Sequence, residues 1–233
     1  MFARYAYAPN ALGYCGPPDA VVLRGGSADE VRAVARRFSG AWPYLCAMSE
    51  LTGITDPLDL RLVESYWLGG GVGATLDPVA FTGALLARIG PLAGSYWTYL
   101  TPDLANEAAA DHNFHVFGVY PWTRLLGKGL SEQAVRVLDS CRITWATVLA
   151  RHDHEITVWS RRLGWDGCRL ALSAPGLRRI PLDDTAPAGL RTGRTVALHW
   201  DRPCDLLTPQ QVRTLATGTA RQLRVTNERL SRR

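Results

Sequence analysis

The sequence predicts an α+β fold, in which a helical N-terminal domain is followed by a small OB-like β-barrel with a C-terminal helix. Up to about residue 140, apolar residues recur at helical spacing between capping signals, whereas from residue 141 they alternate with a period of two. The net charge changes at the same point. Residues 1–140 carry 10 basic and 13 acidic side chains, net −3, and residues 141–233 carry 16 basic and 8 acidic, net +8. We therefore expect two domains, 1–140 and 141–233.

The N-terminal domain is expected to be a series of helices behind an irregular arm. Residues 1–26 are rich in Gly and Pro, which predicts loop structure that packs through its aromatic side chains. Ser27 and Glu30 form a capping box, which satisfies the first free amides of a helix. Further helices are expected over residues 43–51, 57–68, 78–89 and 131–138. The glycine run at residues 69–73 ends one helix, and it is no phosphate loop because no strand precedes it and no Lys-Ser or Lys-Thr pair follows.

The C-terminal domain is expected to be built from short strands. On the first expected strand, Ile143 and Trp145 lie on one face and the residues between and after them lie on the other. An Asp-Gly turn at residues 166–167 separates two strands of a hairpin. Further strands are expected near residues 156–159, 168–172, 177–182 and 195–200. Thr208 and Gln211 form a second capping box, with Pro at the first helical position, and begin the helix that closes the barrel.

The composition excludes several classes of protein. The five cysteines are odd in number and widely spaced, with no C-x-x-C pair. This argues against a zinc ribbon or a secreted disulfide scaffold and favours a reducing, cytoplasmic compartment. The longest uncharged runs hold 14 residues each, whereas a membrane-spanning helix needs about 20 apolar residues. No membrane association is expected.

Two residues at opposite ends of the predicted barrel carry the first functional hypothesis. Cys141 begins the first strand, and Val148 follows seven residues later. Gly193 stands six residues before His199, with an apolar run between them. This pattern of short motifs over the last 85–90 residues resembles the HypC/HupF-type hydrogenase maturation chaperones.

The resemblance implies a specific activity. Such a chaperone holds an iron unit with cyanide and carbonyl ligands through its cysteine thiolate, beside another maturation protein. It delivers the unit to the precursor of the nickel–iron hydrogenase large subunit. Cys141 is then the iron ligand and His199 the residue that supports it. A thiol near Arg142 and Arg194 is expected to ionise more readily than an ordinary cysteine. The alternative is structural, with Cys141 a small buried residue and His199 a strand residue that faces solvent.

A second hypothesis, from a different class, lies in the helical domain. His112 and His115 share one face if their segment is helical, and Cys15 from the aromatic arm supplies a third metal ligand. These residues predict a metal-dependent enzyme of unknown reaction. The alternative is that the two imidazoles only pack within an apolar segment. His152 and His154 lie at an expected hairpin tip and are interpreted as solvated.

Nucleic-acid binding is the third interpretation and the least favoured. It would use the basic C-terminal domain and four tryptophans as stacking platforms: Trp145, Trp159, Trp165 and Trp200. Because these tryptophans fall mostly on strand positions that fill a core, nucleic acid is not an expected partner.

Overall fold

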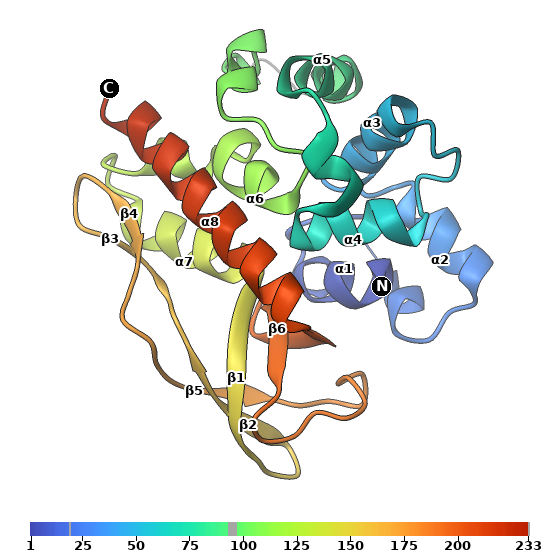
Figure 1. Ribbon diagram of the computed structural model, residues 1–233, viewed down its shortest axis with the longest axis vertical. Coiled ribbons are helices and arrows are strands. Elements are labelled where there is room, and N and C mark those ends of the chain that lie inside the picture. Colours follow the sequence, from blue (N-terminus) through green and yellow to red (C-terminus); the bar gives the residue numbers. More distant parts are fainter. Residues whose placement is uncertain (19, 93–96, 233) are drawn as a thin grey trace.

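The computed structural model describes residues 1–18, 20–92 and 97–232, and it confirms an α+β fold with a C-terminal helix (Figure 1). The helices before residue 141 gather on one side of an antiparallel sheet, and α8 runs across the junction between them. The elements are α1 (Phe2–Ala11), η1 (Ala20–Arg24), α2 (Ala28–Ala35), α3 (Trp42–Thr52), α4 (Leu60–Leu68), η2 (Gly71–Thr75), α5 (Pro78–Ile89), η3 (Gly90–Leu92), η5 (Pro102–Asn106), α6 (His112–Phe114), η6 (His115–Val119), η7 (Pro121–Leu125), α7 (Ser131–Cys141), β1 (Thr144–Arg151), β2 (Glu155–Ser160), β3 (Leu163–Trp165), β4 (Leu170–Leu172), β5 (Gly176–Pro181), β6 (Thr195–His199), β7 (Arg202–Leu206) and α8 (Pro209–Leu230).

The predicted helices of the N-terminal region are present, and one helix was not expected. The capping box at Ser27 and Glu30 begins α2 as predicted. The first residues, however, form α1 in place of an irregular arm. Phe2, Tyr5 and Ala6 recur at helical spacing and are buried, so the packing of this face outweighs the Gly and Pro content of the segment.

The sheet has five strands in the described residues, in the order β5-β2-β1-β6-β7, and every pairing is antiparallel. Strand β1 pairs with β6, so the first and the last of the predicted strands are neighbours in the sheet. The expected closed OB-like barrel is wrong, because no closed barrel forms among these strands. Strands β3 and β4 form a separate two-stranded sheet. The outer strand β7 is covered by α1, whose Arg4 donates to the Cys204 carbonyl at 3.0 Å and pairs with Asp205.

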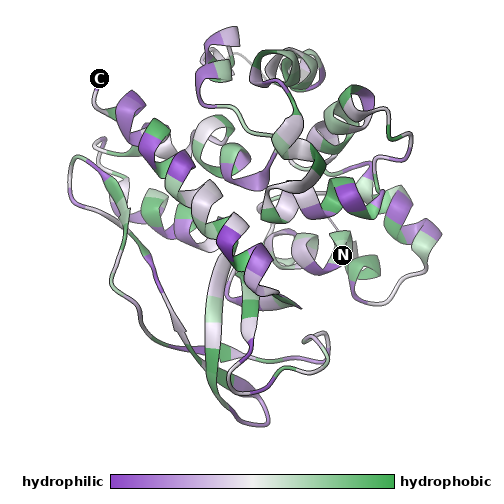
Figure 2. Cartoon of the chain, viewed as in Figure 1, coloured by the Kyte–Doolittle hydropathy of each residue, from purple (hydrophilic) through white to green (hydrophobic). Residues whose placement is uncertain are grey.

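The core is continuous across residue 140. One buried cluster joins helical residues such as Tyr5 and Trp67 to Ile143 of the β1 approach and to Leu215 of α8. The predicted boundary thus marks the change from helix to sheet, and the packing does not separate there. Figure 2 shows hydrophilic and hydrophobic residues interspersed along the length of α8, and Leu215 of this helix is buried in the core cluster. Within the described residues, none of the helices combines the length and apolarity that a membrane crossing requires.

A buried ion pair joins α7 to the sheet. The Arg142 side chain is 1% exposed and donates to Asp139 Oδ1 through Nε at 3.0 Å and Nη2 at 2.8 Å. The same guanidinium donates to the Arg161 carbonyl at 2.5 Å. Asp139 also accepts from the Leu163 backbone amide at 2.8 Å, so one carboxylate orients the start of β1 and the start of β3.

The second predicted capping box is confirmed at the start of α8, where Thr208 accepts from the Gln211 amide. We expect Thr208→Ala to lower the free energy of unfolding by about 1 kcal/mol, because one amide of the first turn loses its partner. Urea denaturation would measure this. The matched control is Thr217→Ala, an exposed position inside α8, and an equal loss in both variants would contradict the capping role.

Candidate metal centre

Three side chains from distant parts of the chain meet at the junction of the helices and the sheet. They are His112 at the start of α6, Cys141 at the end of α7 and His199 at the end of β6. One ligand atom from each lies within 4.8 Å of the other two, and all three side chains are buried. The fold therefore brings the pair predicted from the hydrogenase-type pattern together with one histidine of the alternative site.

His199 is held in the tautomer that a metal ligand requires. Its Nδ1 lies 2.7 Å from the Tyr5 carbonyl oxygen, which only accepts, so Nδ1 carries the proton and Nε2 keeps its lone pair. Nε2 is buried and has no hydrogen-bond partner in the described structure. An imidazole that donates one N–H to a backbone carbonyl while the other nitrogen is free is the usual arrangement of a metal-binding histidine.

A proline in α1 makes the Tyr5 carbonyl available. In an α-helix this carbonyl would accept from the amide four residues later, which here belongs to Pro9. Pro9 has no N–H, so the carbonyl is left without its helical partner and accepts from His199 instead. Pro9 is thus a feature of the site, although the sequence suggested only a loop.

His112 is held between a tyrosine and the Cys141 backbone. Its Nδ1 lies 3.1 Å from the Tyr66 hydroxyl, and its Nε2 lies 3.0 Å from the Cys141 carbonyl and 3.9 Å from the Cys141 Sγ. Because a carbonyl only accepts, Nε2 carries the proton in this arrangement. The Tyr66 hydroxyl can both donate and accept, so it is compatible with the other tautomer, in which Nε2 is free to bind a metal.

Cys141 differs from the sequence expectation in two respects. It is the last residue of α7 and does not lie on the first strand. Burial raises the pKa of its thiol far above the ordinary value, so the expected easy ionisation is wrong for the metal-free protein. Arg142, which was expected to favour the thiolate, is paired with Asp139. A metal ion bound here would supply the missing positive charge, because a coordinated thiol loses its proton.

The electrostatics of the two histidines suit the same role. Burial lowers the pKa of His199 to about 4. Burial also lowers the pKa of His112 well below its ordinary value, with smaller effects of His199 and His115. Both imidazoles are therefore neutral at pH 7, as ligation requires. The alternative in which His199 faces solvent is wrong, since this side chain is 1% exposed. One thiolate with two imidazoles is a donor set for zinc, iron or copper.

The other residues of the alternative site lie beside the centre. His115 stacks on His112 with ring centroids 5.6 Å apart, and Cys15 borders the same small cavity as Cys141. Neither completes a cluster of ligand atoms with His112 in the described structure. The segment from His115 to Val119 is a π-helical turn, a distortion that occurs frequently at functional sites.

Two cavities adjoin each other here. The smaller, about 20 Å³, is bordered by all three ligands, and the larger, about 260 Å³, opens toward α3 and η6. The two cavities share five wall residues and therefore lie side by side: Tyr14, Cys15, Gly40, His115 and Tyr120.

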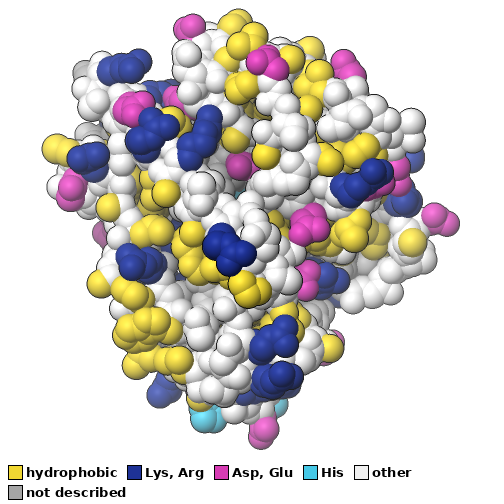
Figure 3. Space-filling model, in the orientation of Figure 1, with side chains coloured by type: hydrophobic (Ala, Val, Ile, Leu, Met, Phe, Trp, Pro, Cys, Tyr) yellow, Lys and Arg dark blue, Asp and Glu magenta, His cyan; other side chains and the backbone are white. Residues whose placement is uncertain are grey.

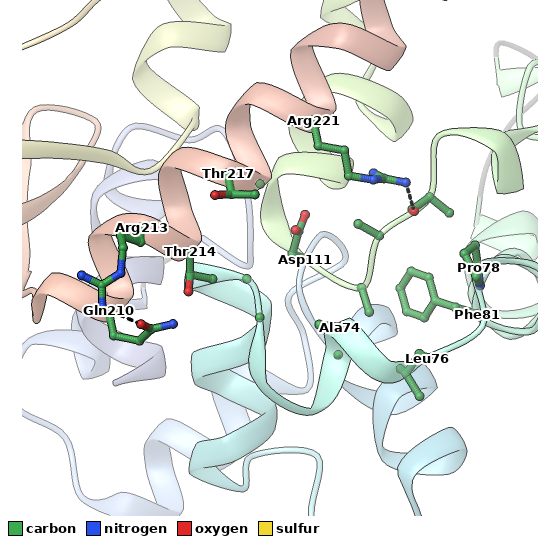
Figure 4. Close-up of a pocket in the computed structure, with 17 residues that line it drawn as sticks. Ala74, Leu76, Pro78, Phe81, Asp111, Gln210, Arg213, Thr214, Thr217 and Arg221 are labelled. Carbon is green, nitrogen blue, oxygen red and sulfur yellow. Dashed lines mark hydrogen bonds between the residues drawn. The ribbon is translucent and has the colours of Figure 1, made fainter.

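A separate cleft of about 560 Å³ lies between the glycine run and α8 (Figure 4). Asp111 lies at its floor and accepts from the Phe114 amide at 3.0 Å, which begins α6. Arg221 turns aside to the Ala108 carbonyl at 2.8 Å. Gly70 has φ +72°, and a Cβ there would lie 2.7 Å from Thr214, so the glycine run serves a close approach of α4 to α8. This agrees with its interpretation as a helix end.

The surface gives little support to a nucleic-acid site. On the face shown in Figure 3, Lys and Arg side chains are interspersed with hydrophobic and acidic ones. Trp145 packs against one core cluster, and Trp165 and Trp200 pack against another. Trp159 is 43% exposed. His152 and His154 are exposed at the hairpin between β1 and β2, as predicted.

The sequence grouped His112 with Cys15 and His115, whereas in the structure its nearest candidate ligands are Cys141 and His199. The available signal was a pair of histidines at the start of a largely apolar segment, residues 112–119, that is buried throughout. A buried imidazole needs polar partners, but the sequence does not show that these partners are Tyr66 and Cys141.

The comparisons with known proteins give a family and no further relatives. A family model described as a family of unknown function, DUF6390, matches residues 1–233. Searches of the curated proteins and of the solved structures found no match.

Proposed function

The chain belongs to the DUF6390 family, whose function is unknown, and we propose from its geometry that it is a metalloprotein. Cys141, His112 and His199 hold one first-row transition-metal ion of borderline softness, such as Zn²⁺ or Fe²⁺. The observation that carries this proposal is the meeting of three buried ligand atoms within 4.8 Å, from three elements of the fold.

The surroundings of the three ligands support the proposal. His199 Nε2 is a buried nitrogen without a partner, and a metal ion would satisfy it. The Tyr5 carbonyl and the Tyr66 hydroxyl orient the two imidazoles from behind. His112 comes from the helical part of the structure and His199 from the sheet, so the geometry of the centre depends on how the helices pack against the sheet.

Three protein ligands leave one position of a tetrahedral ion open, which is typical of catalytic and not of structural zinc sites. The adjoining cavity gives a small molecule access to that position. We therefore favour a metal-dependent enzyme, in which the ion supplies Lewis acidity. His112, Cys141 and His199 hold the ion, and the buried surroundings exclude bulk water.

A second candidate is the role that the hydrogenase-type resemblance implies, as an accessory protein that binds an iron unit for the large-subunit precursor. One observation favours it, namely that Cys141 and His199 lie together beside β1 and β6. The burial of the thiol favours a resident ion over a unit that is passed to a partner. Infrared spectroscopy of purified protein separates the two candidates, because bound cyanide and carbonyl absorb where protein does not.

Metal analysis of protein loaded with Zn²⁺ or Co²⁺ tests the centre. We expect about one ion per chain, and for Co²⁺ a thiolate charge-transfer band. Cys141→Ala should remove the band and weaken metal binding more than about 100-fold, since losing a ligand exceeds the effect of losing a residue behind it. Cys204→Ala is the matched control, because Cys204 is also buried but lies outside the cluster. Equal metal binding in the two variants would refute the proposal.

A further inference from the structure

We infer that the cavity of about 260 Å³ beside the metal centre is the binding site for a neutral, ring-sized organic molecule with one polar group. This inference rests on the proposed metal centre for the direction in which the molecule faces. The binding itself depends on the cavity walls alone.

The size of the cavity limits the ligand. Sites for drug-sized molecules have volumes of about 300–1,000 Å³, so this cavity lies just below that range. It holds a single six-membered ring with a short substituent. The walls include the aromatic rings of Tyr14, Tyr44, Trp97 and Tyr120, which suit the faces and edges of a flat ring.

The walls also limit the charge of the ligand. None of the described residues that border the cavity is Asp, Glu, Lys or Arg. His115 borders it, and its side chain is buried. An ionised ligand would lose its hydration without gaining an opposite charge, which costs several kcal/mol or more. The cavity therefore selects against anions and cations.

Two polar groups in the wall have no partner. The Tyr44 hydroxyl and the His115 Nδ1 are buried and make no hydrogen bond in the described structure. Their rings lie edge to face with centroids 5.4 Å apart. Buried polar groups are nearly always paired in folded proteins, so two neighbouring exceptions beside a cavity point to a ligand that supplies a hydrogen bond. An amide, hydroxyl or ring nitrogen would meet this need.

The position of His115 connects the cavity to the metal. Its ring stacks on His112, a proposed metal ligand, and it borders both the small cavity at the ligands and the larger one. A ring bound in the larger cavity thus has its polar end beside His115 and toward the ion. His115 is assigned as a residue that binds and positions the ligand.

The test uses three probes of one shape and different charge: benzamide, benzoate and benzylammonium. Calorimetry and tryptophan fluorescence on the Zn²⁺-loaded protein should give a dissociation constant below about 1 mM for benzamide. Benzoate and benzylammonium should bind at least about tenfold more weakly. No benzamide binding at about 10 mM, or equal binding of all three probes, would overturn the inference.

Variants locate the site. Gly40→Leu should abolish benzamide binding, because a Cβ at Gly40 already lies 3.3 Å from the His115 ring and the longer side chain fills the cavity. Leu100→Trp blocks the cavity from another wall and serves if Gly40→Leu does not fold. His115→Gln should weaken benzamide binding about tenfold and leave the metal content unchanged. Undiminished binding in folded Leu100→Trp would place the probe elsewhere and overturn the assignment.

The cavity and the metal centre fail separately in these measurements. Cys141→Ala should bind metal much more weakly and still bind benzamide, because Cys141 does not border the larger cavity. Metal-loaded protein that binds no probe refutes the cavity and leaves the metal centre standing. Protein that binds benzamide but no metal refutes the metal centre and leaves the cavity assignment standing.

Discussion

Asp139→Ala is expected to lower the free energy of unfolding by about 3–5 kcal/mol, because it leaves the buried Arg142 guanidinium without its counter-charge. The Arg142 side chain is 1% exposed, so water cannot replace the lost carboxylate. The Leu163 amide loses its acceptor at the same time, which loosens the start of β3. Chemical denaturation followed by circular dichroism would measure the loss.

Two controls distinguish the buried charge from a general effect at this position. Arg162→Ala removes the exposed partner of the same carboxylate and should cost less than about 1 kcal/mol. A double variant, Asp139→Leu with Arg142→Met, removes both charges and should recover much of the stability. If Asp139→Ala and Arg162→Ala prove equally mild, the pair does not stabilise the junction as described.

Acid should destabilise the metal-free protein sharply between pH 6.5 and 4. Burial lowers the pKa of His115 and of His199 to about 4, whereas both titrate near 6.5 in the unfolded chain. The unfolded state therefore binds more protons in this window, so stability is complete above pH 6.5 and is lost as the pH falls toward 4. Each histidine contributes about 3 kcal/mol, since one pKa unit corresponds to about 1.4 kcal/mol.

Urea midpoints at several pH values, with a chelator present, would check this. The slope of the unfolding free energy against pH should correspond to the uptake of two or more protons on unfolding. His199→Gln should reduce the slope by about one proton. His152→Gln replaces an exposed histidine at the hairpin tip and should leave the slope unchanged. A flat profile across the window would contradict the burial of neutral imidazoles.

Local chemistry made much of the fold predictable. The capping boxes at Ser27 and Thr208 are read from neighbouring residues, and both were confirmed. The alternation of apolar and polar residues after residue 141 is also a local pattern, and it predicted the strands. Helix α1 was not predicted because its Pro9 is typical of a loop. Its apolar face is stabilised by the packing of Phe2 and Tyr5 against Trp67, a contact that the local sequence does not indicate. The prediction of a closed barrel was wrong, and nothing in the local sequence indicates that α1 packs against the outer strand β7.

The candidate centre was predictable in part for the same physical reason. Cys141 and His199 lie close together as the sequence pattern indicated, although Cys141 belongs to α7 and not to the first strand. His112 was assigned to another set, since its approach to Cys141 depends on how α6 meets α7. The link to hydrogenase maturation, the partners and the cytoplasmic location stay predictions.

The bond from His199 to the Tyr5 carbonyl spans 194 positions of the chain, and this has a consequence for biosynthesis. A ribosome that has completed α7 has made Tyr5, His112 and Cys141, but the third proposed ligand, His199, and the strand that carries it are still to come. Contacts so distant in sequence close late, after local structure has formed. If the chain holds the metal ion that we propose, the ion is expected to bind after translation has passed β6, and therefore to folded protein and not to the nascent chain.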